Sequence, residues 1–277
     1  MSALSPRMNA IYAIVRRELR SNFYSLGLYA AITVAFTAAV LSVTSNLSSI
    51  AQNGLMSLNS PLSDPLRYAV ILGAAYLALC SAMSITRERD QGTLEVLFYG
   101  PVDSVSYVLA KFLEQILTFA AMILVYLAFF AVVSWATNLG LGWNFLAQAL
   151  MSILLGSALI AFGILLSAVT KRARTSIILF LSFLAFFLVT DLAAGVMGLM
   201  EFSENTASPL IFARDVLSYI RTATSWFSPF DYLDRGLTAI VFGNWGLFAR
   251  RTVEALAYTG VLLWIAVVAF ARKGVRR

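Results

Sequence analysis

Six long runs of apolar residues dominate the sequence. Most are about 20 residues long, which is the length an α-helix needs to cross roughly 30 Å of hydrocarbon at about 1.5 Å per residue. Because backbone polar groups find no water there, each run must be helical. The six predicted spans are residues 26–47, 68–85, 105–135, 145–169, 176–200 and 253–270. The third is longer, and we expect it to start with a cytoplasmic helical extension. The sequence therefore predicts an all-α polytopic membrane protein with a single transmembrane domain over residues 1–277.

The segment before the first span, residues 7–22, is amphipathic. At about 100° per residue, one helical face collects the apolar residues Met8, Ile11, Tyr12, Val15 and Leu19. The opposite face carries the polar residues Asn9, Arg16, Arg17 and Arg20. We expect such a helix to lie in the membrane interface with its basic side toward the headgroups. Glu18 falls at the edge of the apolar face, where it either reaches water or meets a protein partner.

Residues 201–252, between the fifth and sixth spans, form a segment too long for a simple connector. Two short helices are predicted inside it, over residues 209–226 and 230–242. Ser228 can cap the second, and Pro229 suits a first helical position. Both helices carry charges, so neither is expected to span the membrane. They either lie at the outer surface or dip partway into the bilayer.

Lysine and arginine residues divide unevenly between the segments that flank the spans. The four segments on the side of the two termini hold four, three, three and four of them, whereas the opposite side holds only six of the 20. The positive-inside rule therefore places both termini in the cytoplasm. The same rule accounts for the net charge of +6, so nucleic acid is not expected as a partner.

Composition excludes several classes of site. Only 12% of the 277 residues are charged and 60% are hydrophobic, whereas soluble domains carry about 25% charged residues. The sequence has no histidine and one cysteine, Cys80. Zinc sites built from cysteine and histidine, histidine-based triads and intrachain disulfides are therefore excluded. Met197 and Met200 do not change this, because methionine is common in apolar spans, and no metal site is predicted.

The most informative loop follows the second span and covers residues 86–104. Its first ten residues hold five charges. Among them, Gly92 interrupts the helix, and Thr93 after it can cap a short helix over residues 94–99. That helix carries several apolar side chains: Leu94, Val96, Leu97 and Phe98. A short apolar helix between charged flanks is costly to leave in water. It either docks on a partner or lies along the membrane.

This loop resembles the ABC-2 type transporter permeases. The residues that carry the resemblance are Arg87, Glu88, Gly92, Thr93, Leu94, Glu95, Pro101, Val102 and Lys111. The start of the chain, Arg16-Arg17-Glu18-Leu19-Arg20-Ser21, is similar to the same family, as is the Arg235-Gly236 pair before the last span. The subgroup with this pattern includes gliding-motility and copper-processing type permeases.

The resemblance implies a mechanism and a set of partners. The loop would be the coupling element seated in a cleft of a separate ABC ATPase, with Leu94, Leu97 and Phe98 packed in that cleft. Glu88 and Glu95 would pair with basic residues on the partner or on this chain. Two ATPase copies and a second permease half, identical or related, are implied, in a prokaryotic-type plasma membrane.

Cofactors are expected only on the partner. The sequence contains no G-x-x-x-x-G-K-[ST] phosphate-binding motif, so this chain is expected to be a non-catalytic membrane subunit. ATP and Mg are expected on the ATPase.

Asp191 is the one acidic residue well inside a predicted span. It is either a polar point on a translocation pathway or a structural hydrogen-bonding group near the outer interface, helped by Thr190. Gly156 and Gly163 in the fourth span, and Gly195 and Gly198 in the fifth, permit close contact between helices.

Three alternatives compete with an ATP-driven permease. A secondary transporter would need broken helices and polar groups at mid-membrane, and an intramembrane enzyme would need a cluster of catalytic side chains at one depth. Neither pattern is visible. A permease-like subunit that transmits ATP energy mechanically without moving a solute stays open. Substrate and direction also stay open, although nearly uncharged spans favour the export of an amphiphile.

Overall fold

The computed structural model describes residues 6–53, 62–94, 102–138, 140–199, 208–241 and 243–273. These residues form nine helices, and six of the helices are long and apolar enough to cross a membrane. The helices are α1 (Pro6–Phe23), α2 (Leu26–Asn53), α3 (Ser63–Asp90), α5 (Ser104–Thr137), α6 (Trp143–Val169), α7 (Ala173–Leu199), α8 (Ser208–Ser225), α9 (Pro229–Val241) and α10 (Trp245–Lys273). The predicted all-α membrane fold is confirmed.

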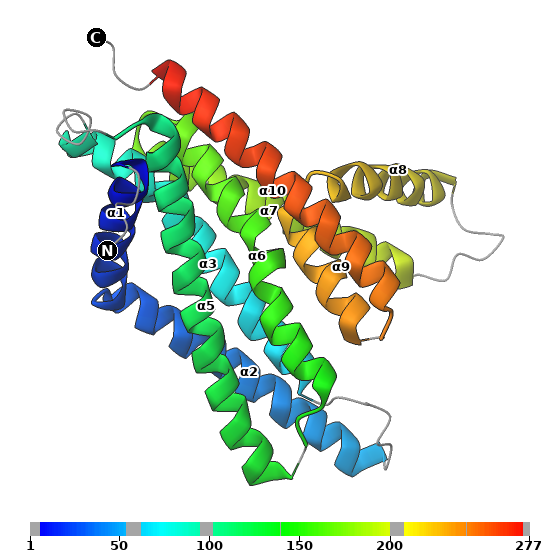
Figure 1. Cartoon of the computed structure of the whole chain (residues 1–277). Coiled ribbons are helices and arrows are strands. Elements are labelled where there is room, and N and C mark those ends of the chain that lie inside the picture. The colour runs from blue at the N-terminus through cyan, green and yellow to red at the C-terminus, as the bar shows by residue number, and fades with distance from the viewer. Residues whose placement is uncertain are drawn as a thin grey trace.

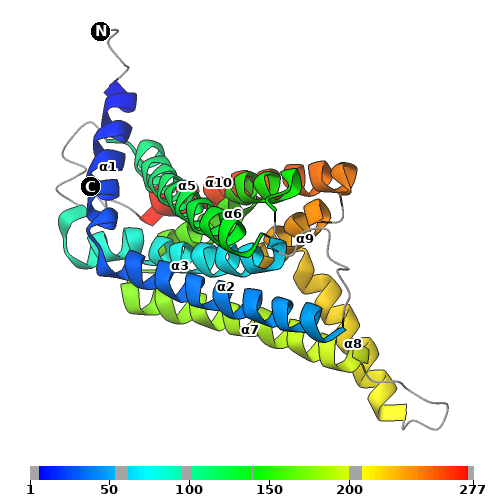
Figure 2. The same ribbon diagram turned by 90° about the horizontal axis from the view of Figure 1, so that it is seen from below.

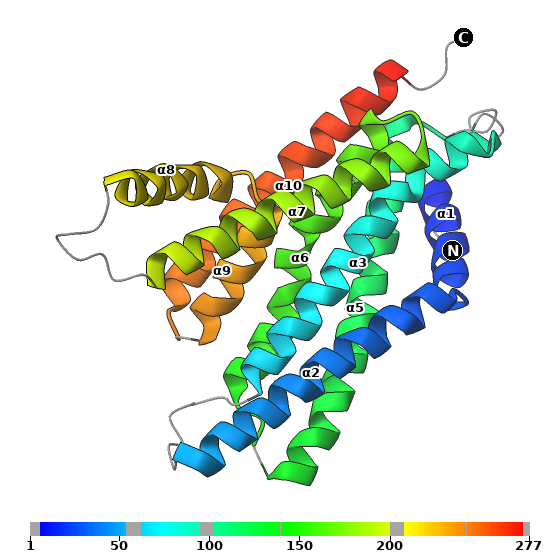
Figure 3. The ribbon, with the colours of Figure 1, turned by 180° about the vertical axis from the view of Figure 1, so that it is seen from behind.

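Successive spans run in alternating directions through the bundle (Figures 1 and 3). Helices α2, α5 and α7 lead away from the end that holds α1, and α3, α6 and α10 return to it. We call the end with α1 and the last turn of α10 the terminal end, and the opposite end the distal end. Helix α1 joins the start of α2 at a steep angle (Figure 2), an arrangement compatible with a helix that lies in a membrane interface.

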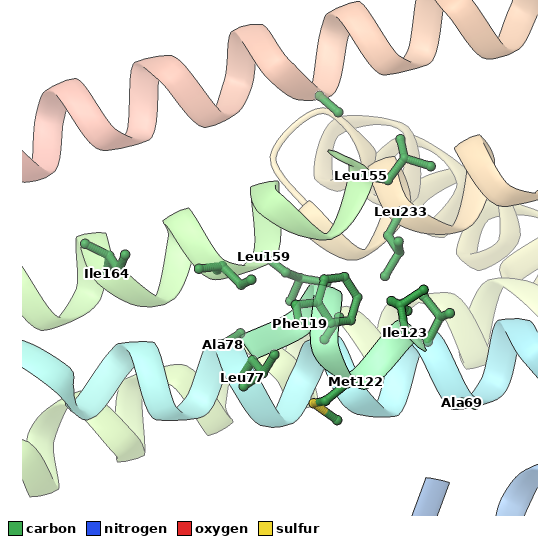
Figure 4. Close-up of a cluster of buried hydrophobic side chains, with 14 of the residues drawn as sticks. Ala69, Leu77, Ala78, Phe119, Met122, Ile123, Leu155, Leu159, Ile164 and Leu233 are labelled. Atoms are coloured by element: carbon green, nitrogen blue, oxygen red, sulfur yellow. The ribbon is translucent and has the colours of Figure 1, made fainter. Parts of the chain in front are cut away.

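Helices α3 and α6 form the centre of the bundle. More than half of the apolar stretch of each is buried, a larger share than in any other span. Figure 4 shows Leu77 of α3, Phe119 of α5 and Leu159 of α6 gathered in one cluster, with Leu233 of α9 beside it; all four side chains are at most 1% exposed. The other spans surround this centre with faces that are apolar and exposed in the single chain.

Two glycines of α6 allow this close packing. A Cβ on Gly163 would collide with the carbonyl oxygen of Ala78 in α3, and a Cβ on Gly156 would collide with the ring of Phe119. The predicted close contact at these two positions is therefore confirmed. Gly195 of α7 differs, because a Cβ there would meet nothing within 4 Å among the described residues.

The α8–α9 pair reaches into the bundle. The hydroxyl of Tyr258 donates to the carbonyl oxygen of Phe227, between α8 and α9, at 2.7 Å. The ring of Phe230 at the start of α9 lies 6.5 Å from that of Phe187. Because Phe187 and Tyr258 stand near the middle of α7 and α10, the pair dips partway in, one of the two arrangements that the sequence left open.

The last span begins earlier than predicted. The sequence placed its start at Val253, beyond Arg250 and Arg251, but α10 begins at Trp245. Both guanidinium groups pair with Glu254 one turn later, at 2.9 and 2.6 Å, so their charges are balanced on the helix itself. The side chain of Asn244 caps the new start by accepting from the Leu247 amide at 3.1 Å.

The glycine contacts predict opposite effects for one substitution at two sites. We expect Gly163→Ala to lower the stability by about 1–3 kcal/mol, because the added methyl group forces α3 and α6 apart. Gly195→Ala meets no such obstacle and should leave stability equal or raise it by up to about 1 kcal/mol, since alanine favours the helix. Thermal unfolding of both variants in detergent checks this. Equal melting temperatures would contradict the close α3–α6 contact.

Candidate functional site

The last turn of α3 is the root of the loop that the sequence singled out. Helix α3 ends at Asp90, and Gly92 follows in a left-handed conformation with φ of 71°. Left-handed backbone favours glycine, because a Cβ would clash with the following carbonyl oxygen. The hydroxyl of Thr93 donates to the carbonyl oxygen of Glu88 at 3.1 Å. The loop therefore leaves α3 by a sharp turn that is tied back to the helix.

A cluster of four charges joins this turn to α1 and α5; we call Arg17, Glu18, Glu88 and Lys111 the ion cluster. The Lys111 ammonium lies 2.6 Å from Oε1 of Glu88 and 3.1 Å from Oε2 of Glu18. The Arg17 guanidinium lies 2.6 Å from Glu18 and 3.1 Å from Glu88. Each cation thus contacts both carboxylates, and the four charges balance.

Burial makes the ion cluster a strong constraint on the structure. The Lys111 side chain is only 2% exposed and that of Glu88 12%. Water cannot stabilise such charges if they separate, so breaking a buried pair typically costs about 3–5 kcal/mol. Burial alone would raise the pKa of Glu18, but Lys111 and then Arg17 outweigh it and hold that pKa below the ordinary value. Glu18 is therefore ionised at neutral pH and keeps its attraction to both cations.

Tyr107 extends the ion cluster toward the last span. Its hydroxyl donates to Oε2 of Glu88 at 2.6 Å, and its ring stacks on Phe270 of α10 with centroids 5.3 Å apart. One turn deeper, the side-chain amide of Asn22 donates to the buried carboxylate of Glu114. Polar contacts at the terminal end therefore join α1, α3 and α5, and the tyrosine ring adds α10.

The same turn of α3 is also fixed to the turn between α6 and α7. A guanidinium nitrogen of Arg89 donates to the carbonyl oxygen of Thr170 at 2.7 Å. The carboxylate of Asp90 accepts from the Ala173 amide at 2.9 Å, at the start of α7, where the helix dipole favours a negative charge. Deeper in the bundle, Ser176 donates to the carbonyl oxygen of Ala82 at 2.6 Å. Residues 88–90 therefore contact four other helices or their turns.

The structure places only some of the predicted coupling residues. Arg87 is exposed, and Leu94 is buried at 5% exposure. Gly92 forms the predicted break, and Thr93 bonds back to α3. Glu95, Leu97, Phe98 and Pro101 lie outside the described residues. The predicted contact of this loop with an ATPase stays a prediction.

The predicted interfacial helix corresponds to α1. Arg16 and Arg20 are exposed, while Arg17 belongs to the ion cluster. Glu18, left open between water and a protein partner, pairs within its own chain with Lys111.

Asp191 lies toward the distal end of α7. Its carboxylate pairs with the Arg221 guanidinium of α8 at 3.3 Å, and its side chain is 44% exposed. Thr190 does not support it as the sequence suggested, because its hydroxyl donates to the carbonyl oxygen of Phe187.

Sequence reasoning missed the partners that complete the ion cluster. The sequence placed Lys111 in the loop motif but did not predict its ion pairs with Glu18 and Glu88. It also gave no role to Tyr107. One signal was available: Lys111 stands seven residues into an apolar helix, where an ammonium group needs an acidic partner. The choice of partner depends on how α1, α3 and α5 meet, which the sequence alone does not show.

Comparison with known proteins gives one family match. A family model described as ABC-2 family transporter protein matches residues 10–275. The match covers all six spans and the ion cluster, and it does not distinguish the gliding-motility or copper-processing type. A search of curated proteins finds no match.

The burial of Lys111 predicts a large effect of removing its charge. We expect Lys111→Met to lower stability by about 3–5 kcal/mol, because the carboxylates of Glu18 and Glu88, only 23% and 12% exposed, then share one cation. Lys171→Met is the matched control, since Lys171 is exposed in the α6–α7 turn. Thermal unfolding in detergent measures both variants. Equal small shifts would show that the ion cluster does not hold the terminal end together.

Proposed function

The chain belongs to the ABC-2 transporter family as a membrane permease subunit, and from this premise we propose that it couples ATP hydrolysis on a separate ATPase to substrate export. The loop over residues 86–104 is the coupling element. It takes up the movement of an ATPase that binds at the terminal end. ATP and Mg bind to that partner, and two ATPase copies act on two permease chains, identical or related.

The anchoring of the loop is the observation that carries this proposal. An ATPase bound to the loop shifts the conformation of the spans only if its contacts differ in free energy between their two states. A loose loop would absorb a push without passing it on. Here the root of the loop is held by the ion cluster and by the α6–α7 turn. A push on the loop therefore reaches α1, α5, α6 and α7 together with α3.

The charges support a cytoplasmic position for the terminal end. By sequence, the segments that flank the spans on that side carry 14 basic and six acidic residues, whereas the segments on the other side carry six basic and eight acidic ones. The whole positive excess of the chain is thus at the terminal end. All six distal arginines pair with carboxylates. Positive charge is retained on the cytoplasmic side of membrane proteins, so both termini would be cytoplasmic.

The middle of the bundle favours an amphiphilic substrate. Its buried polar groups near mid-span include hydroxyls such as those of Ser157 and Thr259, which contact each other at 3.1 Å between α6 and α10. Charged side chains of the described spans stand nearer the two ends. A substrate that needs no charged lining, such as an amphiphile moved outward, fits these spans better than a small ion.

One substitution in the loop tests the coupling role. We expect Leu97→Asp to reduce co-purification with the ABC ATPase, and permease-stimulated ATP hydrolysis, by about tenfold or more, since a carboxylate placed in an apolar cleft costs at least about 1.5 kcal/mol. Leu141→Asp is the control, because it makes the same change to an exposed residue at the distal end.

The two readouts separate the possible results. Loss of both in Leu97→Asp with retention in Leu141→Asp supports the coupling role. If Leu97→Asp assembled and stimulated hydrolysis like the unmodified chain, residues 86–104 would not be the coupling element.

Cysteine labelling tests the orientation. In a Cys80→Ser background, Leu141→Cys at the distal end should react with a membrane-impermeant maleimide in intact cells. Arg172→Cys, in the exposed α6–α7 turn of the terminal end, should react only after the cells are opened. The reverse pattern would place the termini outside.

A further inference from the structure

A polar cavity of about 560 Å³ opens between α8, α9 and α10 toward the distal end. Helix α8 contributes its last two turns, α9 its first two and α10 the stretch around Arg251. The lining residues are Arg221, Thr222, Ser225, Trp226, Asp231, Tyr232, Arg235, Arg250, Arg251 and Glu254. Figure 3 shows these three helices meeting on the side of the molecule away from α1. Four arginines on one cavity are unusual in a chain whose spans are otherwise almost uncharged.

The arginines outnumber the carboxylates that they contact. Arg221 pairs with Asp191 at 3.3 Å and Arg235 with Asp231 at 3.3 Å. Arg250 and Arg251, in contrast, share a single acid, Glu254. Four positive charges thus face three negative ones, which leaves one positive charge uncompensated in the group.

Hydrogen-bond donors are in still greater excess. Each guanidinium has five N–H donors and places one nitrogen on a carboxylate in these pairs. The Nε of Arg251 is buried and finds no hydrogen-bond partner among the described residues. A buried donor without an acceptor destabilises the folded chain, because its lost hydrogen bond to water is not replaced. A tetrahedral oxyanion would supply several acceptors at once, because guanidinium groups bind phosphate in bidentate fashion.

The walls and the depth of the cavity indicate the rest of the ligand. Trp226 and Tyr232 present aromatic surface beside the arginines, and these two residue types are typical of the zone where lipid headgroups meet hydrocarbon. The turn between α8 and α9 reaches the middle of the spans, so the cavity lies in one half of the bundle. A ligand here would meet charged side chains in the distal half of the bundle and aromatic surface next to them.

We propose that this cavity binds the phosphate headgroup of an anionic phospholipid. The headgroup phosphate would accept from Arg221, Arg235 and Arg251, and the acyl chains would lie along the apolar outer face of the bundle. A zwitterionic headgroup is disfavoured, because its ammonium would face guanidinium groups. The proposal goes beyond the coupling role and does not depend on it, since it concerns the chain without its ATPase.

Native mass spectrometry of the full chain in detergent tests the proposal, with phosphatidylglycerol, phosphatidylcholine and inorganic phosphate as probes. We expect phosphatidylglycerol to bind at least about tenfold more tightly than phosphatidylcholine. Arg221→Gln should weaken this binding about tenfold, the effect of losing one charge-assisted contact. Arg214→Gln, on the same helix but outside the cavity lining, should leave it unchanged.

Thr222→Trp provides a test that leaves the charge unaltered. The indole would occupy part of the cavity from its α8 wall and should also weaken phosphatidylglycerol binding about tenfold. Thermal unfolding confirms that each variant is folded. If Arg221→Gln is not, Arg235→Gln replaces it, because Arg235 is another proposed phosphate donor and its side chain is 42% exposed.

Three results would overturn the proposal. The first is equal binding of the two phospholipids. The second is binding of inorganic phosphate as tight as that of phosphatidylglycerol, which would indicate a site for free anions. The third is equal binding by Arg221→Gln, Arg214→Gln and Thr222→Trp. Selective loss in Arg221→Gln and Thr222→Trp would support a headgroup site whether or not the coupling role holds.

Discussion

The ammonium group of Lys111 cannot remain in its buried position without its two carboxylates, and the arrangement of the terminal end follows from this. A buried lysine either loses its proton or gains acidic partners. Here the partners come from α1 and α3, so the interfacial helix and the end of the second span are both held against α5. Arg17 balances the remaining charge. The loop over residues 86–104 begins on this last turn of α3, and its first fixed point is therefore an electrostatic one.

At the distal end, the charged side chains form separate local pairs instead of one buried cluster. Its arginines stand beside acids on the same or a neighbouring helix, and Asp234 of α9 accepts from the Nε of Arg67 of α3 at 2.6 Å. Local pairing allows charged helices to dip between the spans without leaving isolated charges near hydrocarbon. Pairing with Glu254 also balances Arg250 and Arg251, so α10 includes both arginines and begins at Trp245 rather than after them. The surplus of guanidinium donors gathers at one place, the cavity between α8, α9 and α10.

The sequence predicted most of the helices because their cause is local. A run of about 20 apolar residues has few alternatives to a spanning helix, and Ser228-Pro229 marks the start of α9 by its own chemistry. The partners of Glu18 and the role of Tyr107 are not local. They depend on the angle at which α1 crosses the bundle and on the register of α3 against α5. Gly163 lies between these cases: its small size predicted a close contact, but only the structure identified Ala78 as the neighbour.

Helix α3 connects the two ends of the molecule. Near one end it carries Glu88 in the ion cluster, and near the other it carries Arg67, which holds α9. Between them, α3 packs closely on α6 at Gly163, where a Cβ would collide with the carbonyl oxygen of Ala78. Helix α9 is packed on α6 as well, since a Cβ on Gly236 would lie 2.6 Å from a methyl carbon of Leu155. If the loop over residues 86–104 acts as proposed, a displacement at its root would pass from α3 to α6. Through Asp234 and Gly236 it would also reach α9, which is one wall of the distal cavity.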